Sequence, residues 1–197
     1  MTSQLLSRPK KNERCFDVLI AASVALVCAP VAAVVALLVR ATSDGPVIYR
    51  SDRIGADFSS FEMLKFRTMK VETPALATHL LPEPEECLTP VGGFLRRTSL
   101  DEIPQFVNVL KGDMSIIGPR PALFNQDDLM DLRREAGVHR LRPGVTGLAQ
   151  TQGRDTLTLR EKVRLEKLYL ETKSLSVDTR IILDTVNQIF RPSDVKH

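Results

Sequence analysis

The sequence predicts an α+β protein that is mainly helical, with an N-terminal proline-broken apolar helix, a short β-hairpin, and amphipathic helices around a small core. Three observations predict this class. One long segment near the N-terminus has no charge, a second segment alternates around a turn-prone tripeptide, and the C-terminal part has helical periodicity. We expect a single domain over residues 1–197, in which residues 12–40 form a membrane helix and residues 41–190 the cytoplasmic core.

The uncharged segment is long enough to cross a lipid bilayer. Val18 to Val39 comprises 22 residues, of which only Ser23 and Pro30 fall outside the hydrophobic class. At about 1.5 Å per residue, a helix of this length measures roughly 33 Å, against a bilayer core of about 30 Å. A cleaved signal peptide has a shorter apolar region. A soluble helix that is apolar all round needs a larger protein to cover it.

Two topologies fit this helix, a simple spanning helix and a re-entrant helix. A spanning helix usually has more positive charge on one side. Here basic residues flank both ends, from Arg8 to Arg14 upstream and from Arg40 to Arg53 downstream. Pro30 lies near the middle, where its ring and missing N–H favour a kink. The residues alone leave both topologies open.

The elements after this helix follow from local patterns. Val47-Ile48-Tyr49 and Phe61 to Phe66 flank Gly55-Ala56-Asp57, which predicts a hairpin. Residues 71–91 contain four prolines and are expected to form an exposed loop or a short helical excursion. The alternating charges of Leu159 to Leu170 predict a solvated helix. An apolar stripe follows, which either packs on the core or lies at a membrane interface; its residues are Ile181, Ile182, Leu183, Val186, Ile189 and Phe190.

The composition excludes several classes of protein. The net charge of +3 is too small to indicate nucleic acid by itself. There is no Trp, so the chain offers no aromatic platform for stacking bases, and we expect no nucleic-acid partner. Three cysteines without a C-x-x-C pair argue against a disulfide scaffold and a zinc ribbon.

Arginine and glycine are concentrated between residues 92 and 154. This segment has eight of the ten glycines, and eight arginines against one lysine. A merely solvated surface would mix lysine and arginine, whereas arginine favours planar, two-pronged binding of phosphate or carboxylate. The segment therefore predicts an anion-binding site.

The candidate chemical centre lies between Arg96 and Gln105. Ser99 and Glu102 have the spacing of a helix capping box, although Pro104 favours a start closer to Asp101 or a kink. The simplest interpretation is that Asp101 and Glu102 only cap the helix. The functional interpretation is a nucleophile and a metal ligand, because a carboxylate can attack phosphorus and Mg²⁺ commonly binds carboxylates together with substrate phosphates.

Four stretches in register carry a resemblance to a known family. Leu95 to Pro121, LRRTSLDEIPQFVNVLKGDMSIIGPRP, resembles the signature of the bacterial sugar transferases, the monotopic phosphoglycosyl transferases. Lys65 to Met69 (KFRTM), Arg142 to Gly147 (RPGVTG) and Gly153 to Asp155 (GRD) agree with it in order and spacing. The resemblance covers roughly residues 12–190.

The resemblance implies a reaction and a place in the cell. Members of this family transfer a sugar 1-phosphate from a UDP-sugar to a polyprenyl phosphate, usually undecaprenyl phosphate, and release UMP. This step initiates bacterial surface glycans, such as lipopolysaccharide or exopolysaccharide, at the cytoplasmic face of the inner membrane. The family's small members consist of the catalytic core alone, and we expect the same of this chain.

The resemblance also implies roles for individual residues. Asp101 is expected to be the nucleophile that forms a phospho-sugar aspartate, and Glu102 the ligand of a magnesium ion (Mg²⁺). The basic positions assigned to the donor diphosphate or the acceptor phosphate are Lys65, Arg67, Arg96, Arg120 and Arg154. The Gly118-Pro119-Arg120-Pro121 turn is expected to direct Arg120 into the site.

The chain departs from the family pattern at two places. Many relatives have Ser-Pro at the membrane break, where this chain has Ala29-Pro30, which weakens the case for a re-entrant break. Many small relatives have Asn where this chain has Asp155. The sequence does not identify the sugar, the glycan pathway or the oligomeric state. An alternative function is a membrane-anchored module that binds anionic lipid or nucleic acid without catalysis, but this does not explain the paired carboxylates.

Overall fold

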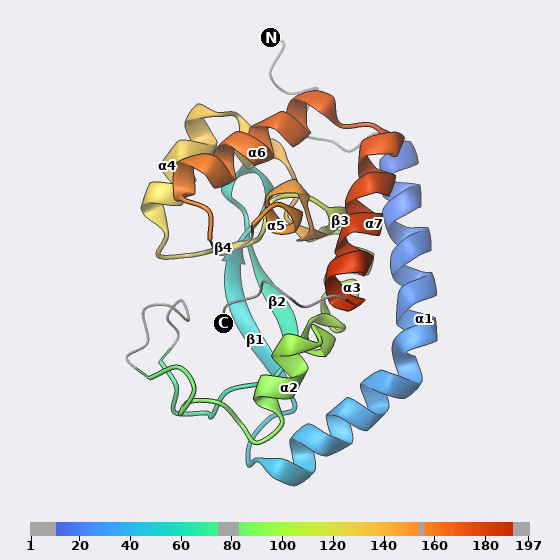
Figure 1. The fold of residues 1–197 in the computed structure, drawn as a ribbon, viewed down its shortest axis with the longest axis vertical. Helices are drawn as coiled ribbons and strands as arrows, with labels where there is room; N and C mark the ends of the chain where they lie inside the picture. Colours follow the sequence, from blue (N-terminus) through green and yellow to red (C-terminus); the bar gives the residue numbers. More distant parts are fainter. Residues whose placement is uncertain (1–10, 75–82, 154–155, 191–197) are drawn as a thin grey trace.

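The computed structural model describes residues 11–74, 83–153 and 156–190. Helices predominate over these residues, with two small sheets between them, which confirms the mainly helical α+β class (Figure 1). The helices are α1 (Lys11–Thr42), α2 (Gly92–Arg97), α3 (Gln105–Lys111), α4 (Asp127–Glu135), α5 (Leu148–Thr151), α6 (Leu159–Thr172) and α7 (Leu175–Phe190), with the short 3₁₀ turns η1 (Ala56–Phe58), η3 (Leu100–Glu102) and η4 (Val138–Arg140).

The predicted hairpin is confirmed. Strand β1 (Ile48–Ile54) pairs with β2 (Ser60–Phe66) in antiparallel register, from Ile48 opposite Phe66 to Ile54 opposite Ser60. The two-residue strand β4 (Ala122–Leu123) pairs with the other edge of β1, so the order of this sheet is β2-β1-β4. A second, parallel pair joins β3 (Ser115–Ile117) to β5 (Gly144–Thr146).

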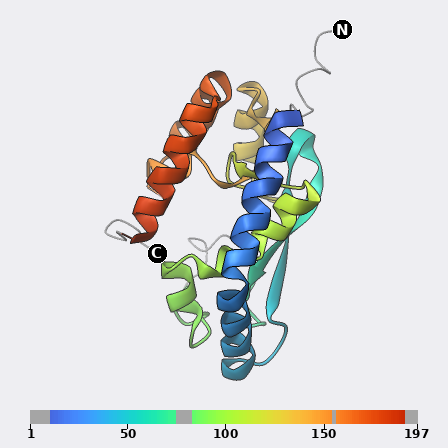
Figure 2. The same ribbon diagram turned by 90° about the vertical axis from the view of Figure 1, so that its right-hand side faces the viewer.

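Helix α1 extends along the whole length of the molecule (Figures 1 and 2). It is one continuous helix with Pro30 inside it, and its axis changes direction between its two halves in Figure 1. An 18-residue window within Glu13–Thr42 has a mean hydropathy of 2.7, and only 11% of that window is buried. By length and composition, this helix is able to cross a membrane.

The same body of the protein holds both halves of α1. At the N-terminal end, Arg14 donates to the carbonyls of Val109 and Leu110 at 2.6 and 2.7 Å. The buried Asp17 accepts hydrogen bonds from the Ser115 hydroxyl and the Ile116 amide. At the C-terminal end, the buried Val35 and Val39 pack with Phe66 and Leu95. Each half of the helix is therefore fixed to the core.

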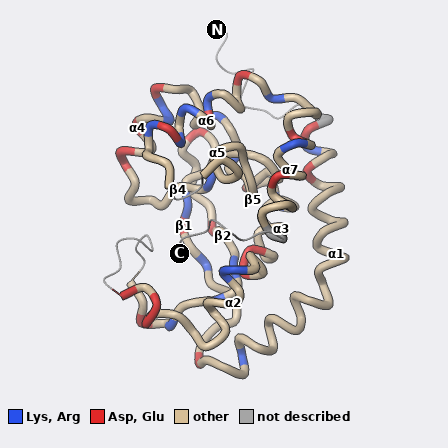
Figure 3. Tube along the Cα trace, in the orientation of Figure 1, with Lys and Arg blue, Asp and Glu red and all other residues tan. Residues whose placement is uncertain are grey.

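Much of α1 nevertheless lacks protein cover. Figure 3 shows that its charges lie near its two ends, whereas Lys and Arg segments gather on β1 and β2 and beside α2. The exposed large apolar side chains of α1 are Leu19, Leu26, Val27, Val31, Val34, Leu37 and Leu38. Exposing this much apolar surface to water is unfavourable.

The C-terminal helices α6 and α7 confirm the helical prediction for the tail. Thr158 caps α6 through a reciprocal capping box with Glu161. In α7 the apolar stripe divides: Ile181 is buried in the main core cluster together with Ala21, Met63 and Tyr169, while Leu183 is 58% exposed. One side of this apolar stripe therefore packs on the core, which is one of the two alternatives that the sequence left open.

Candidate active site

The two adjacent carboxylates lie in η3, between α2 and α3. The predicted capping box at Ser99 is wrong, because Ser99 makes no side-chain capping bond and has a left-handed backbone with φ of 55°. The α-helix begins only after Pro104, at Gln105. Glu102 points instead toward Lys65, and the left-handed residue before the turn has the kind of backbone strain that often accompanies functional sites.

Among the residues that the structure describes, Lys65 is the cation closest to the carboxylates. Its Nζ lies 2.8 Å from Glu102 Oε1 and 3.7 Å from Asp101 Oδ2. All three side chains are less than one-fifth exposed. Because β2 is an alternating strand, Lys65 shares a face with Met63 and Phe61, whose side chains belong to the core. The strand therefore places the ammonium group of Lys65 in a site that is largely closed to solvent.

Two of the arginines that the sequence assigned to this site, Arg96 and Arg120, also lie near the carboxylates. Arg120 Nη1 lies 3.7 Å from Glu102 Oε1, and the Arg96 Nε donates to Thr68 Oγ1 at 3.0 Å. Burial lowers the pKa of Arg96, an effect that the charge of Asp101 opposes and that of Arg120 reinforces. Arg96, Asp101 and Arg120 are therefore close enough for their charges to interact.

Burial also governs the titration of Asp101. Desolvation raises the pKa of its carboxyl, Lys65 lowers it, Glu102 raises it, and Arg96 and Arg120 lower it. The pKa is raised overall, so the ionised carboxylate is less stable here than in water. A carboxylate that is poorly solvated and next to a second carboxylate is a stronger nucleophile than a hydrated one.

The turn that carries Arg120 is held by a buried ion pair. Arg133 of α4 binds Glu166 of α6 through two hydrogen bonds, Nε to Oε2 at 2.8 Å and Nη2 to Oε1 at 2.5 Å. The same Nη2 donates to the main-chain carbonyl of Arg120 at 2.9 Å. Gly118 is required at the start of the turn, because a Cβ there would lie 2.2 Å from the Arg142 carbonyl.

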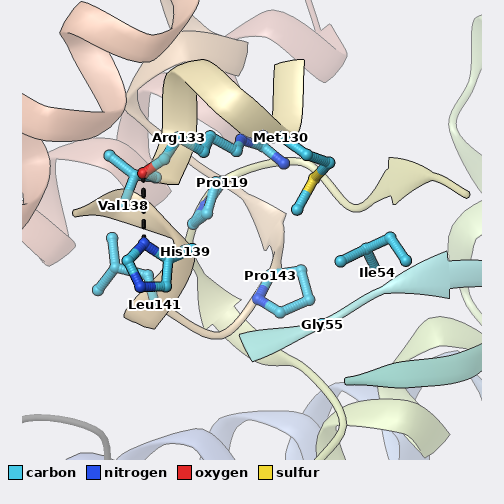
Figure 4. A pocket seen from close by; sticks show the side chains of 9 residues that line it. All are labelled: Ile54, Gly55, Pro119, Met130, Arg133, Val138, His139, Leu141 and Pro143. Carbon is cyan, nitrogen blue, oxygen red and sulfur yellow. Dashed lines mark hydrogen bonds between the residues drawn. The ribbon is translucent and has the colours of Figure 1, made fainter. Parts of the chain in front are cut away.

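A small hollow lies behind this turn. Figure 4 shows Arg133 beside Pro119, with the His139 ring bonded to the Arg133 carbonyl. The hollow measures about 10 Å³, roughly the space of one water molecule, so it cannot hold a sugar nucleotide. It is lined by Ile54, Gly55, Pro119, Met130, Arg133, Val138, His139, Leu141 and Pro143.

The structure gives Arg67 another set of contacts. Its guanidinium donates to the carbonyls of Ser43, Asp44 and Pro46 and to the Ser43 hydroxyl, just after α1 ends. Four of its five N–H groups are used in this way. Arg67 therefore anchors the end of α1 to β2, and its predicted contact with substrate stays a prediction. Arg154, the fifth predicted basic residue, lies outside the described residues, as does Asp155.

The sequence reasoning gave no role to Arg53 of β1, which lies beside the turn that carries Arg120. Burial, followed by the charge of Arg120, lowers the pKa of Arg53 to about 10. Register places Tyr49, Ser51 and Arg53 on the face of the sheet that Lys65 occupies. Strict alternation along β1 and β2 was the signal that could have found it.

The carboxylates are compatible with a magnesium ion whose remaining ligands would come from the substrate and from water. In the part of the chain that the structure describes, no group of three or more His, Cys, Asp or Glu side chains could hold a metal. Mg²⁺ commonly takes one or two carboxylates and fills its other positions with phosphate oxygens and water. Glu102 fits that pattern as a single carboxylate ligand next to the predicted nucleophile Asp101, with no need for a group of three protein ligands.

Two neighbouring glycines test how α2 places Arg96. A Cβ at Gly92 would lie 2.0 Å from the Thr68 carbonyl oxygen, whereas one at Gly93 meets only a Leu88 methyl at 3.6 Å. We expect Gly92→Ala to destabilise the protein by ~1–3 kcal/mol and to reduce activity, because α2 must shift. Gly93→Ala is the matched control and should be neutral or stabilising by up to ~1 kcal/mol. Thermal unfolding in detergent measures both; equal effects would contradict this placement of α2.

A buried carboxylate pair surrounded by cations, beside a long exposed apolar helix, is the arrangement that the resemblance to the bacterial sugar transferases predicts. Comparison with known proteins agrees. The sequence profile described as bacterial sugar transferase matches residues 9–192. The chain therefore belongs to the bacterial sugar transferase family.

Relatives from three bacteria show how far the similarity extends. The chain is 40% identical over 181 residues to a UDP-glucose:undecaprenyl-phosphate glucose-1-phosphate transferase of Escherichia coli K12, covering 88% of this chain and 39% of that protein. A Caulobacter vibrioides protein of the same name is 37% identical, over 89% of this chain and 68% of the relative. The exopolysaccharide production protein ExoY of Rhizobium meliloti is 35% identical, over 88% and 83%.

Proposed function

We propose that this protein transfers a sugar 1-phosphate from a UDP-sugar to undecaprenyl phosphate or another polyprenyl phosphate, releasing UMP. The observation that carries the proposal is the geometry of Asp101 and Glu102, with Lys65 at 2.8 Å from Glu102 and Arg120 at 3.7 Å from it. The names of the E. coli and Caulobacter relatives, which specify this type of reaction, support it.

The proposed mechanism has two displacements at the phosphorus that carries the sugar. In the first, an Asp101 carboxylate oxygen forms a bond to that phosphorus, the bond to the bridging oxygen of the diphosphate breaks, and UMP leaves with that oxygen. In the second, a phosphate oxygen of the polyprenyl acceptor attacks the same phosphorus and the bond to Asp101 breaks. The carboxylate is regenerated and the product is a polyprenyl diphospho-sugar.

The surrounding side chains supply the electrostatics of this reaction. Lys65 holds the carboxylates in place, while Arg96 and Arg120 provide positive charge where the leaving phosphate becomes more negative. A magnesium ion bound by Glu102 would add further neutralisation of the diphosphate. Burial keeps water from competing with the lipid acceptor for the intermediate.

The apolar helix fits an enzyme with one soluble and one lipid substrate. We place α1 in the cytoplasmic leaflet of the bacterial inner membrane as a re-entrant, monotopic anchor. Both halves of α1 pack on the same body, through Asp17 at one end and Val39 at the other, which a helix spanning the bilayer could not easily achieve. Pro30 inside the helix and basic residues at both flanks support this topology.

Purified protein in detergent provides the direct test. We expect UMP release from a UDP-sugar that depends on polyprenyl phosphate and Mg²⁺, screened across UDP-sugars because the structure does not identify the sugar. Binding to any anionic polymer without UMP release from any donor would instead support the non-catalytic binding module.

Replacing Lys65 should shift the pH dependence of the rate. Asp101 must be ionised to attack, so activity rises as pH rises through its pKa. Lys65 lowers that pKa, and Lys65→Met should therefore move the acidic limb to higher pH and reduce the rate at neutral pH by ~10²-fold. Lys65→Arg keeps the charge and should keep the position of the limb. An unchanged pH–rate profile in Lys65→Met would show that Lys65 does not control Asp101.

A further inference from the structure

Arg53 is a cation beside the turn of Arg120 that the sequence analysis did not assign to the site. It lies near the end of β1, opposite Phe61 of β2 and Leu123 of β4, so strands border it on both sides. Its side chain is on the face that carries Lys65 and is only partly exposed. The strands therefore fix Arg53 beside the turn that carries Arg120, where its Nη1 donates to the Pro121 carbonyl.

The contacts of Arg53 do not neutralise its charge. Its Nε donates to Ser51 Oγ at 3.1 Å, and its Nη1 donates to the Pro121 carbonyl at a long 3.4 Å. Within the described residues, no carboxylate lies within ion-pair distance of its guanidinium. After burial, the largest influence on the pKa of Arg53 is another cation, Arg120, whose charge lowers it.

Placing two arginines together in a partly buried site costs free energy unless an anion joins them. Among the described residues, Lys65, Arg96 and Arg120 lie near the two carboxylates, whereas Arg53 lies beside the turn of Arg120 and has no ion-pair partner. Arg53 therefore adds a positive charge near Arg120 that no described ion pair balances. A phosphate group is the complementary partner, because each guanidinium offers two parallel N–H donors to its oxygens.

We propose that Arg53 and Arg120 form a clamp that binds a phosphate group of the substrate. This inference rests on the proposed function, because the phosphate belongs either to the UDP-sugar or to the polyprenyl acceptor. Arg120 contributes one guanidinium group from the turn after β3, and Arg53 contributes the other from the sheet. The buried Ser51 orients the Arg53 guanidinium, because its hydroxyl accepts a hydrogen bond from Arg53 Nε.

A purely structural role for Arg53 is the competing explanation. Its bond to the Pro121 carbonyl could hold the turn that carries Arg120. A structural role predicts lower thermal stability in Arg53→Gln with and without ligand. A clamp predicts instead that the stabilisation produced by ligand is lost.

The experiment compares Arg53→Gln with Arg50→Gln in the full chain in detergent. Arg50 is on the opposite face of β1, exposed and paired with Glu62, and serves as the matched control. UDP is the donor probe, followed by equilibrium binding and by its effect on the melting temperature, neither of which requires turnover. The KM for polyprenyl phosphate is the acceptor arm.

If the clamp holds the donor, Arg53→Gln should weaken UDP binding by ~10–100-fold and remove its thermal stabilisation. If it holds the acceptor, UDP binding stays intact and the KM for polyprenyl phosphate rises by a similar factor. Arg53→Lys should recover part of either loss. If Arg53→Gln does not fold, Arg53→Lys is used in its place. UDP affinity and acceptor KM both within twofold of the Arg50→Gln control would overturn the inference.

The two levels of the proposal fail separately. A wild-type chain that binds UDP in an Arg53-dependent way but releases no UMP would contradict the proposed function and leave the clamp intact. An Arg53→Gln variant that turns over normally would contradict the clamp and leave the proposed function intact.

Discussion

Replacing Asp101 with Asn is expected to reduce UMP release by ~10³-fold or more without loss of stability. Asn has almost the same shape, but its amide does not form the bond to phosphorus that the proposed reaction requires. Asp101 is buried, with only 8% of its side chain exposed, so no second carboxylate can take its position without moving the turn. The measurement is UMP release with saturating donor and acceptor.

The stability of the same variant separates chemistry from folding. Because burial raises the pKa of Asp101 above its value in the unfolded chain, its ionised form opposes folding as pH rises through that range. Asn carries no such charge, and Asp101→Asn should melt no lower than wild type at pH 7–8. An inactive variant that also melts much lower would assign Asp101 a structural role.

The second large effect is expected from Arg133→Met. Arg133 and Glu166 are 5% and 2% exposed, and removing the guanidinium leaves a buried carboxylate without its partner. Breaking such a pair costs ~3–5 kcal/mol. The loss should appear as a large fall in melting temperature in detergent, together with lower activity, because the Arg120 carbonyl also loses its donor.

The double variant Arg133→Met/Glu166→Leu is the control for this prediction. Replacing both charges with apolar side chains should restore most of the stability, since buried pairs are often replaceable by well-packed apolar residues. Activity should recover less than stability, because nothing then holds the Arg120 carbonyl. A double variant as unstable as Arg133→Met would show that packing, and not the unpaired charge, causes the loss.

Local patterns predicted the elements whose formation depends on neighbouring residues. The hairpin follows from alternation on either side of Gly55-Ala56-Asp57, and α6 follows from its alternating charges. The capping box at Ser99 failed because Glu102 forms its ion pair with Lys65, which is 37 residues away. Local propensity could not anticipate a partner from another strand.

The residues of the site also divide into those that local motifs predict and those that depend on distant parts of the chain. The paired carboxylates and three of the five basic residues could be assigned from their motifs, and the structure brings Lys65, Arg96 and Arg120 around them. Arg67 has the right spacing, but its guanidinium is occupied by the carbonyls after α1. Arg53 and the Arg133–Glu166 pair depend on strand register and on helix packing across 33 residues, which no short motif contains.

The most direct test of the central claim is a search for the covalent intermediate. Wild-type protein is incubated with a UDP-sugar labelled in the sugar, without acceptor, and is then denatured and examined for label on the chain. The mechanism predicts a labelled chain with one equivalent of UMP released, loss of the label when polyprenyl phosphate is added, and no label in Asp101→Asn. UMP release without labelled protein, or label that persists in Asp101→Asn, would contradict it.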